Sequence, residues 1–183
     1  MRGLVVHVYG EAGSGKTTLA LRIASSLSGR GFQTIYVSRS IPRGFLKFEG
    51  DRVVFLRVSS DECLVSLPET VESLLSPRVK LIVVDSVAGL FRNLRETGRL
   101  RLLPFVALRL RRTALKKGLC VLLLNEVTSM NGEVKAWEGE EVDKYSDESI
   151  RLEKWMAARV ALEPLEHLTP TFKGLHSWLR RLK

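Results

Sequence analysis

Short apolar runs alternate along the chain with segments in which apolar residues recur every three or four positions. Five runs are rich in valine, leucine and isoleucine, which is typical of strands covered on both faces. They span Gly3–Tyr9, Thr34–Ser38, Arg52–Val58, Lys80–Ser86 and Leu119–Val127. Strands that alternate with helices predict an α/β fold, a mostly parallel sheet with helices on both faces.

Helices are predicted between these runs. The first begins at Lys16 and ends at the glycines at positions 29 and 31. A second, broken helix follows the polar stretch 59–62 and contains Pro68, and a basic helix covers roughly residues 99–117. Each predicted helix connects one predicted strand to the next.

The pattern weakens after Val127. Residues 128–149 are polar and acidic, which predicts a loop, whereas Ala157–Leu165 is predicted as a last strand. The tail from Phe172 is a short basic amphipathic segment. We expect one domain over residues 1–183, with a core in 1–127 and the acidic loop, final strand and basic tail in 128–183.

Composition narrows the class of partner. The chain has 183 residues, of which 45% are hydrophobic, so a globular core is expected. No apolar run reaches the roughly 18 residues that a membrane span needs, so we expect no membrane partner and a cytoplasmic protein. The formal net charge of +9 favours an anionic partner, nucleic acid first.

Residues 10–17, GEAGSGKT, match the phosphate-binding pattern G-x-x-x-x-G-K-T in full, between a predicted strand and a predicted helix. Glycines let backbone N–H groups wrap an anion, and the helix amino end adds partial positive charge. The expected nucleotide-binding residues are Gly10, Glu11, Ala12, Gly13, Ser14, Gly15, Lys16, Thr17 and Thr18. We expect ATP with Mg²⁺, with Lys16 reaching the β- and γ-phosphates and Thr17 ligating the metal.

Asp85 ends the fourth predicted strand. A carboxylate at the carboxyl end of a buried parallel strand lies at the edge where such sheets bind ligands. Asp85 is therefore predicted to hold Mg²⁺ together with Thr17. The alternative is an aspartate that only caps a turn.

These motifs, in this order, resemble the RecA/RadA recombinase superfamily, and most closely its short archaeal RadB-type paralogues. The matching stretches are YGEAGSGKTTLALRIA, LIVVDSVAGLFR and VLLLNEVTS, and the resemblance covers roughly Leu4 to Val127. It implies a RecA-like P-loop NTPase core that binds ATP and serves DNA recombination or repair. The implied partners are DNA, single-stranded first, and a RecA/RadA-type recombinase or a related paralogue subunit.

The sequence departs from that family's pattern in four places. Ser40 occupies the position of the glutamate that polarises the attacking water, and Glu126 replaces the glutamine that senses the γ-phosphate. The chain starts at the first strand, so we expect no amino-terminal DNA-binding or polymerisation module. Between residues 133 and 148, which match the family's second DNA-binding loop, seven acids oppose Lys135 and Lys144. This segment would repel phosphodiesters and suits a protein partner better.

Ser40 cannot act as a general base, so weak or absent hydrolysis is expected. The resemblance implies that the strand ending at Glu126 lies between the strand of the phosphate loop and the strand of Asp85. Glu126 could then face the γ-phosphate and orient water, which makes Lys16 and Glu126 the candidate catalytic residues. In the alternative, Glu126 points away and pairs with an arginine of a partner.

Basic residues concentrate between positions 92 and 117, where only Glu96 opposes them. The resemblance assigns Arg92 and Arg95 to a first DNA-binding loop after the fourth strand, and Arg99 and Arg101 follow as further candidates for DNA binding. Such contacts would reach phosphates and depend on salt but not on sequence. A solvated helix face and a docking surface for an acidic subunit are the alternatives.

The sequence therefore predicts an ATP-binding, RecA-like accessory protein of recombination or repair with weak or absent hydrolysis. Two alternatives belong to other classes. One is a P-loop phosphotransferase that acts on a small metabolite or nucleotide, which would need an acceptor pocket. The other is a signalling ATPase that resembles the KaiC group.

Overall fold

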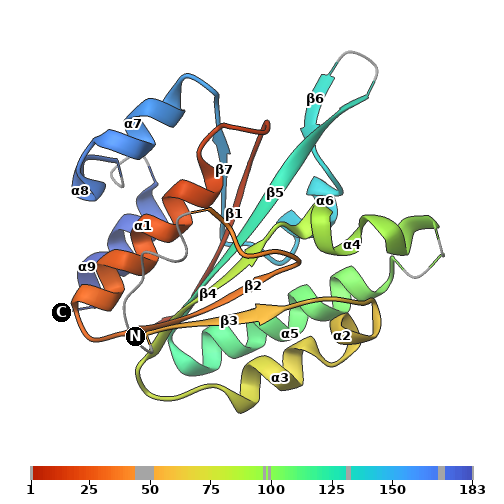
Figure 1. Ribbon diagram of the computed structural model, residues 1–183, viewed down its shortest axis with the longest axis horizontal. Coiled ribbons are helices and arrows are strands. Elements are labelled where there is room, and N and C mark those ends of the chain that lie inside the picture. The colour runs from red at the N-terminus through yellow and green to blue at the C-terminus, as the bar shows by residue number, and fades with distance from the viewer. Residues whose placement is uncertain are drawn as a thin grey trace.

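The computed structural model describes residues 2–43, 52–96, 98, 100–130, 133–168 and 172–182. The strands are β1 Leu4–Gly10, β2 Gln33–Ser38, β3 Val53–Arg57, β4 Val79–Asp85, β5 Cys120–Met130, β6 Glu133–Ala136 and β7 Glu148–Leu152. They form one seven-stranded sheet in the order β3-β2-β4-β5-β1-β7, and β6 pairs antiparallel with the end of β5 (Figure 1). All other pairs are parallel, which confirms the predicted fold class.

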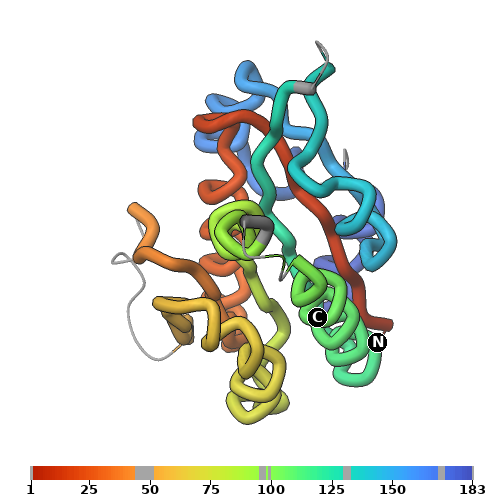
Figure 2. Tube along the Cα trace, turned by 90° about the vertical axis from the view of Figure 1, so that its right-hand side faces the viewer, coloured from red at the N-terminus to blue at the C-terminus, as the bar shows by residue number. Residues whose placement is uncertain are grey.

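Helices cover both faces of this sheet (Figures 1 and 2). They are α1 Lys16–Gly29, α2 Glu62–Val65, α3 Leu67–Ser73, α4 Val87–Glu96, α5 Leu102–Lys117, α6 Gly139–Asp143, α7 Met156–Leu162, α8 Leu165–Leu168 and α9 Lys173–Arg181. Buried residues of α1, α7 and α9 form one core layer, and those of α2 to α6 form the other. None of the helices in the described ranges combines the length and the apolar character that a bilayer crossing needs.

The central strands supply both core layers at once. On β5, Val121 and Leu123 pack in the layer of α5, whereas Leu122 and Leu124 pack in the layer of α1. Successive side chains of a strand point to opposite faces, so a strand covered on both faces has no polar side. This is why the sequence shows continuous apolar runs at these positions.

The carboxyl third differs from the prediction. The acidic segment, predicted as a loop, contains β6, α6 and β7. The predicted last strand, Ala157–Leu165, was wrong, because these residues belong to α7 and α8, and the last strand is β7. In α7 the one buried residue is Val160, so this helix shows no repeated apolar positions. In β7, Ile150 and Leu152 are buried at the spacing of two that a strand requires.

A buried polar chain joins the acidic segment to the sheet. Asn125 Nδ2 donates to the carbonyl of Trp137 at 2.7 Å and lies 3.2 Å from His7 Nε2. His7 Nδ1 lies 2.7 Å from Asp143 Oδ1 on α6. An amide nitrogen only donates, so Nε2 accepts and Nδ1 carries the proton that Asp143 accepts. Burial lowers the pKa of His7 below its ordinary value, although Asp143 acts in the opposite direction. The lowered pKa keeps the ring neutral.

Helix α9 closes the layer that contains α1. The carboxylate of Glu148 accepts hydrogen bonds from the backbone N–H groups of Gly174 and Leu175 at 3.3 and 3.1 Å. An acid at a helix amino end is favourable because the N–H groups there carry partial positive charge. Trp178 is then fully buried between α9 and the sheet.

Replacing Trp178 by alanine is expected to lower the free energy of unfolding by about 3–5 kcal/mol, because a large buried side chain leaves a cavity. The control is Trp155→Ala, since the Trp155 side chain is 67% exposed, and its expected cost is below about 0.5 kcal/mol. Urea unfolding followed by circular dichroism measures both. Equal losses in the two variants would contradict the burial of α9.

The pKa of His7 predicts how stability changes with pH. Its folded pKa is below the unfolded value of about 6.5, so its stabilising contribution is complete above that pH and is lost as the pH falls. His7→Gln is expected to have a flatter dependence of unfolding free energy between pH 7 and 5 than the wild type. His167→Gln, at an exposed position on α8, is expected to keep the wild-type slope. A steep slope in His7→Gln would argue against the neutral ring.

Candidate nucleotide-binding site

The predicted phosphate loop, residues 10–17, connects the end of β1 to the start of α1. Gly13 and Gly15 have φ angles of 80° and 93°, in the left-handed region that favours glycine. Space at Gly10 is also restricted, because a Cβ there would lie 2.2 Å from the carbonyl oxygen of Leu152. The Ser14 hydroxyl is buried and has no hydrogen-bond partner among the described residues. A phosphate oxygen would supply that partner, so the loop fits the group that its sequence predicts.

Lys16 lies inside this loop. Its ammonium donates to the carbonyl oxygens of Gly10 and Glu11 at 2.7 and 2.8 Å. Burial lowers the pKa of Lys16, and the negative charges of Glu126 and Asp85 oppose this shift. The cation therefore lies in a partly desolvated position with two carboxylates nearby, where a phosphate would interact strongly with it.

Thr17 and Asp85 meet across the carboxyl ends of the strands. Thr17 Oγ1 donates to Asp85 Oδ2 at 2.9 Å, and the Tyr36 hydroxyl donates to the same oxygen at 2.5 Å. Burial and the charge of Asp85 raise the pKa of Tyr36, so the phenol remains a donor. Two donors thus fix one carboxylate oxygen of Asp85, and its other oxygen is left for a cation.

Strand order explains why these groups are close. Strand β5 lies between β4, which ends at Asp85, and β1, which ends at Gly10. In this register Gly10 is paired with Glu126, and Asp85 is paired with Leu124. The position that the resemblance implied for the strand of Glu126 is therefore observed.

Ser40 lies in a cleft beside this site. The cleft has a volume of about 360 Å³, and its lining includes Thr17, Ser40 and Asp85. The neighbouring Arg39 turns toward α4, where its guanidinium donates to the carbonyl oxygens of Gly89 and Leu90 at 2.7 and 2.9 Å. The end of β2 thus supplies a hydroxyl and a bound arginine where a hydrolase of this build needs a carboxylate.

Glu126 has an arginine partner within its own chain. Its Oε2 lies 2.5 Å from Arg92 Nη2 on α4, and its Oε1 accepts from Ser86 Oγ at 3.3 Å. Both side chains of the ion pair are about half exposed. The charge of Glu126 therefore acts on the pKa of Lys16, while Arg92 and Ser86 engage its carboxylate.

The four candidate DNA-binding arginines do not form one described cluster. Positions 92 and 95 lie in helix α4, so the prediction that they belong to a loop is wrong, because apolar residues of α4, among them Phe91 and Leu94, pack the helix onto the sheet. The side chain of Arg95 and all of Arg99 lie outside the described residues. Arg101 is exposed immediately before α5.

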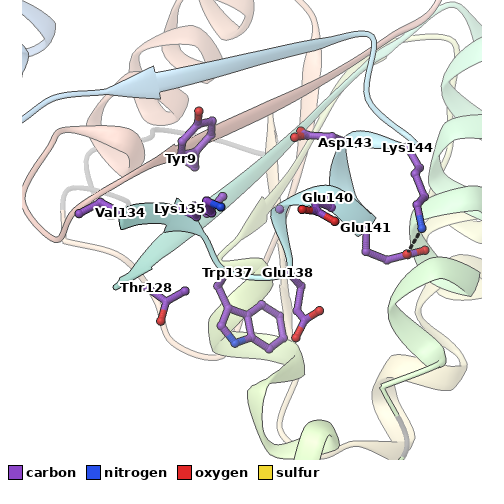
Figure 3. Close-up of a pocket in the computed structure, with 12 residues that line it drawn as sticks. Tyr9, Thr128, Val134, Lys135, Trp137, Glu138, Glu140, Glu141, Asp143 and Lys144 are labelled. Carbon is purple, nitrogen blue, oxygen red and sulfur yellow. Dashed lines mark hydrogen bonds and ion pairs between the residues drawn. The ribbon is translucent and has the colours of Figure 1, made fainter. Parts of the chain in front are cut away.

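The acidic segment surrounds a pocket of about 530 Å³ (Figure 3). Figure 3 shows that Tyr9, Thr128 and Val134 line it together with Trp137 and the residues of α6. Its charged residues are Lys135, Glu138, Glu140, Glu141, Asp143 and Lys144. Acids outnumber lysines, and Lys144 is paired with Glu141 at 2.6 Å. The pocket therefore disfavours nucleic-acid phosphates.

Two parts of this site were missed in the sequence. The first is Tyr36, whose hydroxyl donates to Asp85. The second is Arg39, whose guanidinium connects the end of β2 to α4. A tyrosine between Ile35 and Val37 of a buried strand is a usable signal, because a buried hydroxyl needs a partner. The sequence has no comparable signal for Arg39, since its acceptors are backbone carbonyls.

No protein-family model matches the chain. Protein RecA of Geobacter sulfurreducens is 30% identical over 145 residues, which cover 69% of this chain and 41% of that protein. DNA repair protein RadA of Campylobacter jejuni is 31% identical over 97 residues, which cover 51% of this chain and 21% of that protein. The chain thus spans about two fifths of the first relative and about one fifth of the second.

Among solved structures, a KaiC-like protein of the hyperthermophilic archaeon Pyrococcus horikoshii shares the fold. The TM-score is 0.61 at 21% sequence identity, over 83% of this chain and 72% of that chain. The similarity extends beyond the part of the chain in which sequence motifs are recognisable. Together, the shared fold and the RecA and RadA relatives support a RecA-fold nucleotide-binding protein of the RecA/RadA superfamily.

Proposed function

We propose that the chain is an ATP-binding, RecA-like accessory protein of DNA recombination or repair, similar to the short RadB-type paralogues, with weak or absent hydrolysis. The observation that carries this proposal is the 2.9 Å hydrogen bond between Thr17 Oγ1 and Asp85 Oδ2. It holds a hydroxyl and a carboxylate side by side next to the phosphate loop. Oxygen ligands of this kind are what Mg²⁺ with a nucleotide requires.

Each residue of the site has a distinct role in binding. Backbone N–H groups of the loop and the Ser14 hydroxyl donate to phosphate oxygens. Lys16 exchanges its two carbonyl acceptors for charged phosphate oxygens, which accept stronger hydrogen bonds. Thr17 and Asp85 hold Mg²⁺, which neutralises phosphate charge when bound. Tyr36 positions Asp85 without contacting the nucleotide.

Slow hydrolysis follows from the carboxylates that are present. Among the described residues that line the cleft, Asp85 is the one carboxylate, and both Thr17 and Tyr36 donate to it. The Ser40 hydroxyl is too weak a base to accept a proton from water. Arg92 and Ser86 engage the two carboxylate oxygens of Glu126, so this side chain is not free to orient a water molecule.

The DNA and protein partners are inferred from charge and from the relatives. The RadA relative is named a DNA repair protein. The net charge of +9 favours an anionic partner. The acidic pocket favours a basic protein surface, which we assign to a recombinase or to a related paralogue subunit. In this proposal Arg92, Arg95, Arg99 and Arg101 contact DNA.

Lys16→Ala and Asp85→Ala are expected to weaken Mg-ATP binding by about tenfold or more, because each removes a charged contact worth about 1.5–3 kcal/mol. Calorimetry measures the dissociation constants, and Lys144→Ala, far from the loop, is the control. Single-stranded DNA is then titrated with and without ATP at two salt concentrations. DNA affinity that changes with ATP supports the recombination role, whereas phosphate transfer to small metabolites, with no DNA effect, would favour a phosphotransferase.

Ser40→Glu is expected to raise ATP turnover by at least about tenfold, because a positioned general base contributes roughly 10²–10⁴ to a rate. Ser40→Ala is expected to match the slow wild type. Phosphate release with saturating Mg-ATP is the measurement. Glu126→Ala tests whether Glu126 supplies the residual turnover, and we expect little change because Arg92 and Ser86 engage it. A fast wild type that Glu126→Ala inactivates would contradict the proposed slow hydrolysis.

A further inference from the structure

Cations without an ion-pair partner gather at the edge of the sheet where strands β3, β2, β4 and β5 begin. We call this surface the basic edge, and it consists of Arg30, Arg52, Arg78, Lys80 and Lys117. None of the five forms an ion pair with an acid in the described part of the chain. The nucleotide site lies at the opposite edge, where the strands end.

Backbone pairing brings these residues together. The N–H of Gln33 donates to the carbonyl of Arg78, and the N–H of Thr34 donates to the carbonyl of Arg52, both at 2.8 Å. Residues that are far apart in the sequence therefore lie side by side at the starts of β2, β3 and β4. Figure 1 shows that both chain ends lie at this end of the sheet, where Arg2 and Arg181 add further exposed charge.

Two hollows lie along the basic edge. The first has a volume of about 500 Å³ and is lined by Gly31, Gln33, Arg52 and Arg78. The second, of about 200 Å³, is lined by Lys80 and Lys117 among apolar and small residues. They are neighbours, because Ser76 of the second donates to the side-chain oxygen of Gln33 in the first at 2.9 Å. No acidic residue is among the described lining residues of either hollow.

Helix dipoles explain only part of this charge. Arg30 and Lys117 lie at the carboxyl ends of α1 and α5, where a cation is favourable. Arg52, Arg78 and Lys80 lie at strand starts and receive no such benefit. Their mutual repulsion costs stability, which an anionic ligand would remove.

The donors of the basic edge are largely unused. Arg78, Lys80 and Lys117 have no side-chain hydrogen bond to a described residue, and Arg52 donates to the carbonyl of Ser28. Some cations elsewhere form ion pairs instead. On α5, for example, Arg109 pairs with Glu69 and Glu72 on α3. The basic edge is therefore a surface of free cationic donors rather than a network of surface ion pairs.

We propose that the basic edge binds the sugar-phosphate backbone of nucleic acid without reading its base sequence. Three strand spacings separate β3 from β5, a distance of about 14 Å. About four nucleotides of one strand span the same distance at a rise of 3.4 Å per nucleotide. Four cations, Arg52, Arg78, Lys80 and Lys117, cover that span. No aromatic residue is among the described residues that line either hollow, so the contacts are to phosphates and not to stacked bases.

This binding does not depend on ATP. The seven residues of β1 separate the two edges, which is about 23 Å at 3.3 Å per residue. That is more than two Debye lengths at physiological salt. Charge at the basic edge therefore has little direct effect on the nucleotide site, and the inference is independent of the proposed ATP-linked function.

The test compares two variants with equal net charge. The edge variant carries Arg52→Gln, Arg78→Gln, Lys80→Gln and Lys117→Gln. The control variant carries Lys135→Gln, Lys144→Gln, Arg151→Gln and Arg159→Gln, which lie elsewhere and are all ion-paired. Fluorescence anisotropy with labelled 30-nucleotide single strands and duplexes, without nucleotide, gives the affinity at several salt concentrations. Circular dichroism and Mg-ATP calorimetry of each variant check the fold.

The edge variant is expected to bind DNA at least tenfold more weakly than the wild type. Its salt slope is expected to fall by about 3, since each lost phosphate contact removes about 0.7–0.9. The control variant is expected to stay within about threefold of the wild type. Equal losses in both variants, or an unchanged salt slope in the edge variant, would overturn the proposal. So would an edge variant that keeps DNA affinity but loses self-association, because the ligand would then be the acidic pocket of a second copy.

Failure here is distinguishable from failure of the proposed function. If no form of the protein binds Mg-ATP, the proposed function fails while the DNA comparison still decides the basic edge. If Mg-ATP binds and the two variants do not differ, only the inference about the basic edge fails.

Discussion

Contact between the phosphate loop and Asp85 depends on the adjacency of three parallel strands. Strand β5 separates β1 from β4 by one strand width on each side, so a hydroxyl that begins α1 reaches a carboxylate that ends β4. Apolar layers on both faces of the sheet hold this arrangement, because a slip of one residue would move every buried side chain to the wrong layer. Tyr36 adds a second donor to the same carboxylate from β2. The site is thus fixed by the packing of the whole sheet.

Helix α4 is held from two sides around the cleft beside that site. Arg39, just after β2, donates to backbone carbonyls near the start of α4, and Arg92 on α4 pairs with Glu126 of β5. Both arginines occupy positions next to residues where water activation is expected in an ATP hydrolase of this build. The cleft therefore combines anchored walls with a single carboxylate, Asp85, among its described lining residues.

Charge is distributed unequally between the two edges of the sheet. The acidic segment runs along the sheet, from β6 at the end of β5 to Asp147 beside Val5 of β1, whereas the basic edge lies at the starts of β3, β2, β4 and β5. The buried chain from His7 to Asp143 fixes the acidic segment to the sheet, so its charge has a defined place. The net charge of +9 is thus the sum over a molecule that has one acidic and one basic surface. Different partners can approach the two edges without competing.

The sequence by itself determined β1 to β5 and the helices α1 to α3 and α5, because buried strands and the loop 10–17 are encoded locally by apolar runs and glycines, but it missed helix α4. It did not determine β7 or α7, because a five-residue strand in acidic surroundings and a helix with one buried residue carry almost no periodic signal. Only the tertiary structure decided that Glu126 pairs with Arg92 and that the cations of the basic edge meet. The pair of Arg92 and Glu126 joins residues 34 positions apart, and the cations of the basic edge come from positions 30 to 117. Strand order, which is set by packing, brings them together.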